Sequence, residues 1–366
     1  MIDDHAHPFT GEFCPLELSK ITLGAPLAPG AANAGHGPRR VFAELLSVRL
    51  ARLLSVPVQE LAQARNELAA ADWPGYVRRL FDDAGISAMV IDEGVASFDG
   101  AGLKTCAEVA ARPMWALARI DPLVDQAIAA GACAEEIVLA LEAYVEGALE
   151  QGAVGFKTIL AYRTGLEVDP HVTIEEAEAS LEMAREDELA PRRAGKALRD
   201  LVTVRLLSLA ADCGRPVQIH TGFGDSDIRL GESNPLLLEE LLRSPAGRAA
   251  TIVLIHGAYP WHEEVAYLAT VCPKLYAEVS LSNLFAPLLV TDRLARILEL
   301  APLDKVLAGS DGHGLPETHW FACRVLQEAF EGVGKMLLAA GARAGFVREA
   351  RSRLLEDNAR VVYGLS

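Results

Sequence analysis

The chain has 366 residues, of which 51% are hydrophobic and 23% are charged, a composition that supports a large buried core and excludes an intrinsically disordered protein. Its 50 acidic residues outnumber its 34 lysines and arginines, and the formal charge of −16 argues against nucleic acid or an anionic membrane surface as a partner. No apolar run is long enough to cross a bilayer, so no membrane attachment is expected.

The first expected strand covers residues 1–5 and leads directly into a His-x-His pair, His5 and His7. Because side chains alternate along a strand, both imidazoles would lie on one face, with Asp3 on the same side, and could bind one metal ion. Two neighbouring histidines can also be ordinary surface residues, so their meaning depends on the rest of the chain. Residues 8–38 are rich in glycine, proline and alanine and are expected to form a lid over the site.

A helical insertion is expected after the first strand, at residues 39–84. Apolar residues recur at intervals of three and four in residues 41–54, Pro57 opens a second helix, and Asp72 begins a third. After this insertion, short apolar runs alternate with helical patterns. The runs that we expect to form strands are residues 87–91, 114–120, 154–159, 216–220, 251–256, 275–279 and 306–310.

Together with residues 1–5, these runs give eight strands joined by helical segments. Such alternation predicts a parallel sheet, and eight units predict an α/β fold closed into a (β/α)8 TIM barrel, with residues 1–366 as a single domain. Among the connections, Thr173 and Glu176 have the spacing of a capping box at the start of a helix. Residues 317–365 are expected to form C-terminal helices that pack outside the barrel.

The carboxyl ends of the expected strands carry chemically useful side chains, which is where (β/α)8 barrels place their catalytic groups. The residues in question are His5, His7, Lys157, His220, His256 and Asp311. Imidazole and carboxylate are ligands that divalent metals such as zinc prefer, and ligands from separate strands can converge on one point. Any one of these histidines could be a core or rim residue, but the set predicts a metal centre.

The strand-end motifs resemble those of the metal-dependent amidohydrolase superfamily over the whole chain: DDHAH at residues 3–7, QIHT at 218–221, LIHG at 254–257 and GSD at 309–311. More narrowly, residues 154–163 and 358–365 resemble the branch that contains the amidohydrolase domain of nodulin and glutamine-synthetase fusion proteins. The resemblance implies a TIM-barrel enzyme that uses one or two divalent metal ions, with zinc as the first candidate.

The resemblance also implies individual ligand roles. His5, His7 and Asp311 would bind the first metal. His220 would either join them or belong to a second metal. His256 would bind that second metal or hydrogen-bond the attacking water.

Lys157 occupies the position at which two-metal members of the superfamily carry a carboxylated lysine that bridges the ions. Carboxylation would turn a buried cation into an anionic ligand, whereas an unmodified ammonium could pair with a substrate carboxylate. In the implied mechanism, a bound divalent ion lowers the pKa of its water to about 7. Asp311 would accept the proton of that water and pass it to the leaving group.

Arg119, Tyr162 and Arg163 follow expected strands on the same rim, and guanidinium groups form paired hydrogen bonds with carboxylates. These three residues are therefore candidates for binding an acidic substrate. The alternative is that each arginine holds a loop or pairs with Asp121 or Glu167.

The sequence thus predicts a hydrolase that cleaves an amide, ester or lactone bond of a small, carboxylate-bearing molecule. A metal-dependent decarboxylase or hydratase is the alternative within the superfamily, and a barrel that only binds is a third class. The six cysteines are scattered without a Cys-x-x-Cys pair, which indicates reduced thiols and a cytoplasmic protein. A homo-oligomer is expected as the assembled form.

Overall fold

The computed structural model spans the 366 residues and describes all of them except 19–20, 22, 24–39, 95–100 and 187–194. Most of the segment expected to form a lid, residues 8–38, lies outside the described residues. Its first part is placed by Phe9, which forms a parallel bridge with Gly314 after the last strand.

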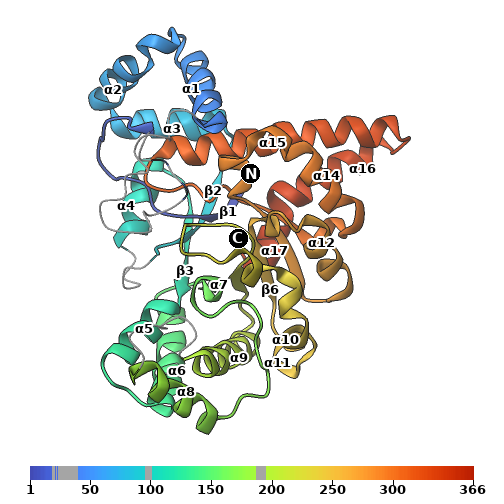
Figure 1. The fold of residues 1–366 in the computed structure, drawn as a ribbon. Coiled ribbons are helices and arrows are strands. Elements are labelled where there is room, and N and C mark those ends of the chain that lie inside the picture. Colours follow the sequence, from blue (N-terminus) through green and yellow to red (C-terminus); the bar gives the residue numbers. More distant parts are fainter. Residues whose placement is uncertain (19–20, 22, 24–39, 95–100, 187–194) are drawn as a thin grey trace.

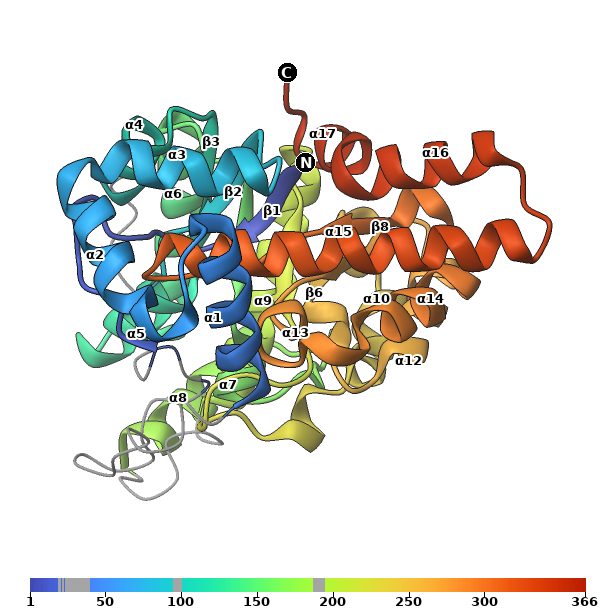
Figure 2. The same ribbon diagram turned by 90° about the horizontal axis from the view of Figure 1, so that it is seen from above.

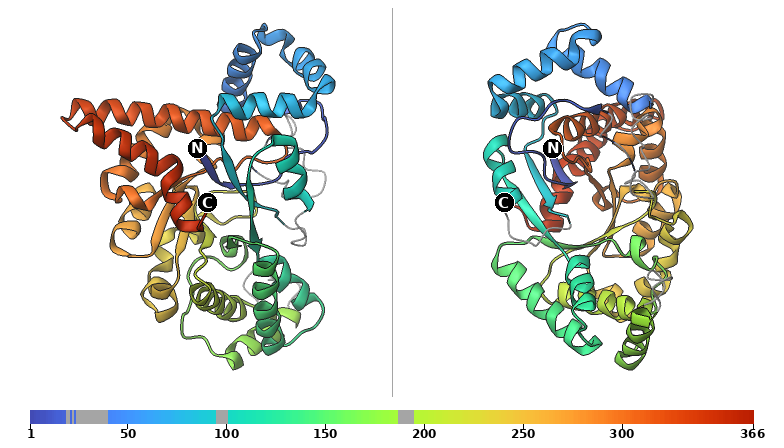
Figure 3. Two further views of the ribbon diagram at one scale, coloured as in Figure 1. Left: turned by 180° about the vertical axis from the view of Figure 1, so that it is seen from behind. Right: turned by 60° about the vertical axis from the view of Figure 1, so that its left-hand side comes forward.

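Eight parallel strands form a nearly closed barrel at the centre of the molecule, with helices around it (Figures 1 and 3). The strands are Ile2–Ala6 (β1), Ala88–Asp92 (β2), Met114–Arg119 (β3), Gly155–Thr158 (β4), Val217–His220 (β5), Ile252–Ile255 (β6), Leu275–Val279 (β7) and Val306–Ala308 (β8). They pair in chain order from β1 to β8. The predicted (β/α)8 barrel is confirmed, because every strand was expected within two residues of its observed bounds.

The segment that follows β8 completes the circle. Asp311 N donates to His5 O at 2.9 Å, and His7 N donates to Gly312 O at 2.8 Å. These bonds attach the polypeptide after the last strand to the first strand. They also bring His5, His7 and Asp311 to the same end of the barrel.

Helices connect the strands and cover the barrel wall. They are Ala101–Ala110 (α4), Asp121–Ala129 (α5), Ala134–Glu150 (α6), Leu160–Arg163 (α7), Ile174–Glu186 (α8), Lys196–Asp212 (α9), Glu239–Arg243 (α10), Pro245–Ala249 (α11), His262–Val271 (α12), Ser282–Phe285 (α13) and Val290–Leu300 (α14). The capping box predicted before α8 is present, since Thr173 N donates to Glu176 Oε2 at 2.8 Å and Glu176 N donates to Thr173 Oγ1 at 3.2 Å. None of the described helices is both long and apolar enough to cross a bilayer.

The expected helical insertion follows β1 and consists of Val41–Leu54 (α1), Leu61–Ala71 (α2) and Trp73–Asp83 (α3). Helix α3 lies beside Pro316–Ala339 (α15) in both views (Figures 1 and 2). A buried ion pair joins the insertion to α15, with Arg65 Nε 2.6 Å from Glu317 Oε1. Tyr76 Oη donates to the same oxygen at 2.7 Å, and the Trp73 ring centroid lies 5.3 Å from the guanidinium carbon.

The C-terminal helices are α15, Ala344–Ser352 (α16), a π-helical turn at Arg353–Asp357 and Asn358–Tyr363 (α17), as the helical pattern of residues 317–365 predicts. Helix α17 covers the amino-terminal end of the barrel. Its Tyr363 packs in one cluster with Ile2 of β1 and Val253 of β6. This end of the barrel is therefore filled, and the opposite, carboxyl end carries the cavity described next.

Candidate metal centre

One cavity of about 440 Å³ opens at the carboxyl ends of the strands. The cavity is lined by all nine side chains that were predicted from the sequence to form the site: His5, His7, Arg119, Lys157, Tyr162, Arg163, His220, His256 and Asp311. Apolar side chains, Leu281 and Phe285 among them, line other parts of its wall together with His313. The fold thus brings into one place residues that are spread from the first strand to the last.

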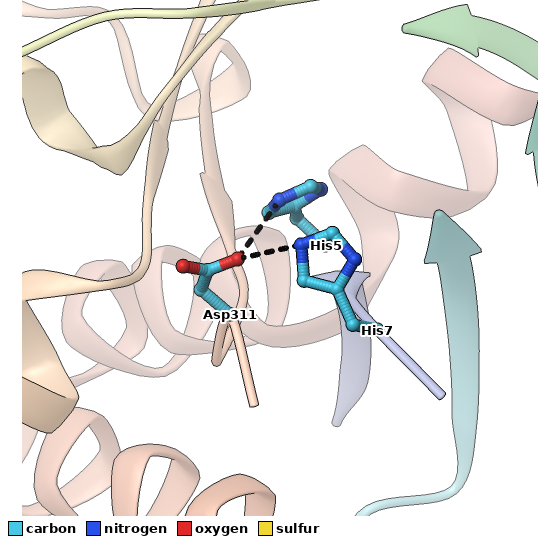
Figure 4. A group of neighbouring side chains, drawn as sticks. All are labelled: His5, His7 and Asp311. Atoms are coloured by element: carbon cyan, nitrogen blue, oxygen red, sulfur yellow. Dashed lines mark ion pairs between the residues drawn. The ribbon is translucent and has the colours of Figure 1, made fainter. Parts of the chain in front are cut away.

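His5, His7 and Asp311 form a compact group of possible metal ligands (Figure 4). Asp311 Oδ1 lies 3.1 Å from His5 Nε2 and 3.3 Å from His7 Nε2. Ligand atoms bound tetrahedrally at about 2.0–2.1 Å would be roughly 3.3 Å apart, so both separations fit a shared ion. Asp311 also has a φ of 53°, and His256 has a φ of 73°. Such left-handed conformations are uncommon for residues other than glycine and concentrate at functional sites.

Two hydrogen bonds to carbonyl oxygens fix imidazole tautomers in the cavity. His7 Nδ1 lies 2.8 Å from Asp92 O, and His220 Nε2 lies 3.2 Å from Phe223 O. A carbonyl oxygen only accepts, so these nitrogens carry the hydrogens and leave lone pairs on His7 Nε2 and His220 Nδ1. In the neutral imidazole the His7 lone pair faces the Asp311 carboxylate. Burial lowers the pKa of His7, but hydrogen bonding to Asp311 outweighs it and raises that pKa, and a bound cation would take the place of the proton. The donor set therefore fits a divalent metal held by nitrogen and carboxylate oxygen.

Lys157 is the most deeply placed cation of the cavity, with Nζ 3.5 Å from His5 Nε2. Burial lowers the pKa of Lys157 to about 8, although the negative charge of Asp92 opposes the shift. Burial and then the charge of Lys157 lower the pKa of His5 to about 4. His5 is consequently neutral near pH 7, with a lone pair available for an ion.

The two arginines of the rim are already paired with carboxylates. Arg119 Nη2 lies 2.5 Å from Asp92 Oδ2, and Arg163 Nη2 lies 2.9 Å from Asp125 Oδ2. The sequence offered Asp121 or Glu167 as partners in one alternative. Arg119 bonds Asp92 because parallel pairing places β2 beside β3. Both guanidinium groups nevertheless line the cavity.

Asp3 does not lie on the same side as His5 and His7, and this prediction was wrong. The register of β1 against β2 shifts between Asp3 and Ala6, which breaks the alternation of side chains. Asp3 faces away from the cavity and accepts hydrogen bonds from Ser310 N at 2.7 Å and Ser310 Oγ at 2.6 Å. It holds the backbone next to Asp311.

Glu278 and Ser280, at the end of β7, were missed by the sequence reasoning. His256 Nδ1 lies 2.7 Å from Ser280 Oγ, which in turn lies 2.7 Å from Glu278 Oε2. One pattern in the sequence could have identified Glu278 and Ser280. Tyr276, Glu278 and Ser280 recur with the period of two that puts them inside the barrel, where a charged side chain requires a partner.

The family model described as Amidohydrolase matches residues 2–365. The chain belongs to the amidohydrolase family. The recognition made from the sequence motifs is thereby confirmed, and the His5, His7 and Asp311 group of this amidohydrolase is a possible metal site of a metal-dependent superfamily.

The chain is also similar to individual known proteins. The amidohydrolase is 28% identical over 369 residues to the protein fluG of Emericella nidulans, covering 91% of this chain and 42% of that protein. The chain thus spans less than half of that relative. A solved structure described as a candidate metal-dependent hydrolase from Lactobacillus casei superposes with a TM-score of 0.86 at 24% identity, covering 99% of this chain and 94% of the other.

A uronate isomerase from Thermotoga maritima also superposes, with a TM-score of 0.70 at 13% identity and coverage of 99% and 94%. Similarity at this level of identity establishes the barrel shared by the amidohydrolase and the isomerase. The reaction has to be argued from the site.

Proposed function

We propose that this amidohydrolase is a metal-dependent hydrolase that cleaves an amide, ester or lactone bond of a small, carboxylate-bearing molecule. The observation that carries the proposal is the shared position of Asp311 Oδ1 between His5 Nε2 and His7 Nε2 in the strand-end cavity. When bound there, a divalent ion, for which zinc is the first candidate, lowers the pKa of water to about 7 and polarises a carbonyl group.

Asp311 is proposed to move the proton. Burial opposes its ionisation, but the electrostatic influence of His256 and the close approach of the His5 and His7 imidazoles hold the pKa of Asp311 well below its usual range. Its second oxygen points away from both histidines (Figure 4). That oxygen can accept a proton from the attacking water and deliver it to the leaving group.

His220 and His256 complete the proposed ligand set, either with the first ion or around a second one. Lys157 decides between these cases. As a neutral amine it can add to carbon dioxide, release a proton and become an anionic carbamate, which would suit a second ion as a ligand. As an ammonium it would pair with a substrate carboxylate. Two metals per chain with a carbamate in the electron density support the first case, and one metal with a bare ammonium supports the second.

Arg119, Tyr162 and Arg163 are proposed to bind the substrate carboxylate. Their side chains line the cavity around the possible ligand group, and a guanidinium offers a carboxylate two parallel hydrogen bonds. By analogy with the fusion proteins of the narrower branch, a γ-glutamyl amide is the first substrate to try.

Metal analysis followed by a substrate screen tests the proposal. The purified enzyme should contain divalent metal, lose activity with a chelator and regain it with zinc. The screen covers N-acyl amides, γ-glutamyl amides and lactones, and hydrolysis in ¹⁸O-labelled water should place the label in the product. A protein that neither contains nor takes up divalent metal would overturn the proposal.

A metal-dependent decarboxylase or hydratase is the second candidate. Arg119 and Arg163 line the same cavity as the possible metal ligands, an arrangement that also suits a substrate whose carboxylate is itself lost. Release of carbon dioxide from aromatic acids, without incorporation of labelled water, would identify the decarboxylase.

We further propose that residues 1–366 act as one domain in the cytoplasm and assemble as a homo-oligomer. All six cysteines are free, which suits a reducing compartment. Light scattering on the purified protein measures the oligomeric state, and a monomer at micromolar concentration would contradict that part of the proposal.

A further inference from the structure

A buried polar chain runs from the end of β7 to the end of β6. Glu278 and Ser280 are fully buried, and His256 is 1% exposed. Glu278 Oε2 lies 2.7 Å from Ser280 Oγ and 2.9 Å from the backbone nitrogen of His256. Ser280 Oγ lies 2.7 Å from His256 Nδ1. No part of the proposed reaction uses Glu278 or Ser280.

The direction of these hydrogen bonds follows from the groups involved. Glu278 Oε2 accepts the backbone N–H of His256, so it is an acceptor, and the Ser280 hydroxyl donates its single hydrogen to that oxygen. Ser280 Oγ can then only accept from His256, which places a hydrogen on His256 Nδ1. This direction holds while Glu278 Oε2 carries no proton.

We infer that Glu278 and Ser280 are positioning residues that hold His256 in its Nδ1–H tautomer and aim the Nε2 lone pair into the cavity. His256 Nε2 lies 2.9 Å from His220 Nδ1, which has a lone pair because His220 Nε2 donates to Phe223 O. Two lone pairs at this distance repel each other, and a nearby cation relieves the repulsion. The inference rests on the proposed function, because this orientation matters to a reaction only if the cavity takes an ion.

Gly309 on the neighbouring segment makes the arrangement possible. A Cβ atom at Gly309 would come 2.6 Å from Glu278 Oε1 and 3.0 Å from His5 N, so a larger residue would displace the carboxyl group. The position of Glu278 is therefore set from both sides, by hydrogen bonds at Oε2 and by the glycine at Oε1.

Zinc affinity of the purified protein tests the inference without reference to turnover. Removal of a residue that orients a ligating histidine typically weakens metal binding by about 10–100-fold. We expect that loss for Ser280→Ala in a competition titration with a chromophoric chelator. Ser282→Ala is the matched control, since Ser282 is also buried in the same turn but its hydroxyl makes no bond to His256. Equal affinities of the two variants would overturn the inference.

Histidine nitrogen NMR gives a second readout that a merely structural role would not change. In metal-free protein labelled with ¹⁵N-histidine, His256 should be protonated at Nδ1, and Ser280→Ala should shift it toward the other tautomer. Glu278→Gln, which keeps an acceptor oxygen, should retain the Nδ1–H form, whereas Glu278→Met should lose it. Protonation of His256 at Nε2 in the wild type would overturn the inference. A wild type that binds no zinc would overturn the proposed function, and the spectrum would still test the tautomer.

Discussion

Replacing Glu317 by glutamine would leave the Arg65 guanidinium buried without its partner charge. Both side chains are fully buried, and Arg65 Nε lies 2.6 Å from Glu317 Oε1. Breaking a buried ion pair from one side costs about 3–5 kcal/mol, because the remaining charge stays out of water. We expect Glu317→Gln and Arg65→Met each to lower the free energy of unfolding by this amount, since the pair holds the helical insertion against α15.

Thermal unfolding followed by circular dichroism measures the effect. An unfolding entropy of about 2.1 cal/mol/K per residue gives roughly 0.8 kcal/mol/K for this chain, so the expected loss lowers Tm by about 4–6 °C. The double variant removes both charges and should lose clearly less than the sum of the single losses. Single variants within about 1 °C of the wild type, or a double variant that loses the full sum, would refute the reasoning.

Three further variants test other parts of the molecule. Asp311→Asn should abolish turnover but leave some metal bound, since the amide keeps an oxygen ligand and cannot take the proton of the attacking water. Steady-state rates and metal analysis check this prediction, and unchanged turnover would remove Asp311 from the mechanism. Gly224→Ala should raise KM, because its Cβ would come 1.8 Å from Tyr162 Oη and displace that ring; an unaltered KM contradicts a role for Tyr162. His319→Met should reduce sensitivity to acid. Burial lowers the pKa of His319, so the unfolded state gains a proton as the pH falls through about 6.5 and the wild type loses stability there. Between about pH 7.5 and 5.5 the Tm of the variant should fall by less than the Tm of the wild type. Equal decreases in Tm would refute the role of His319 in acid sensitivity.

The strands and the site-forming residues were predictable because their signals are local. A short apolar run that ends in one polar side chain, as in β8 and Asp311, shows both the strand and the position of its end. Once eight such ends are recognised, the barrel brings them together at one face. This is why His5 and Asp311 could be placed in one cavity without any sequence proximity.

The failures concern contacts between elements. The side on which Asp3 lies depends on a register shift against β2, and the partner of Arg119 depends on the neighbouring strand. The short helix α7, which carries Tyr162, has only four residues and no periodicity to detect. Glu278 was missed because its importance comes from Ser280 and His256, which meet it only after folding.

The attachment of the segment after β8 to β1 gives the metal site a role in assembly. His5 and Asp311 come from opposite ends of the barrel order, so an ion bound between them would join the two edges of the sheet where it closes. Such a link connects residues separated by most of the chain, for which the entropy of loop closure is large. It would stabilise only the closed barrel. The metal-free enzyme should then open first along this junction.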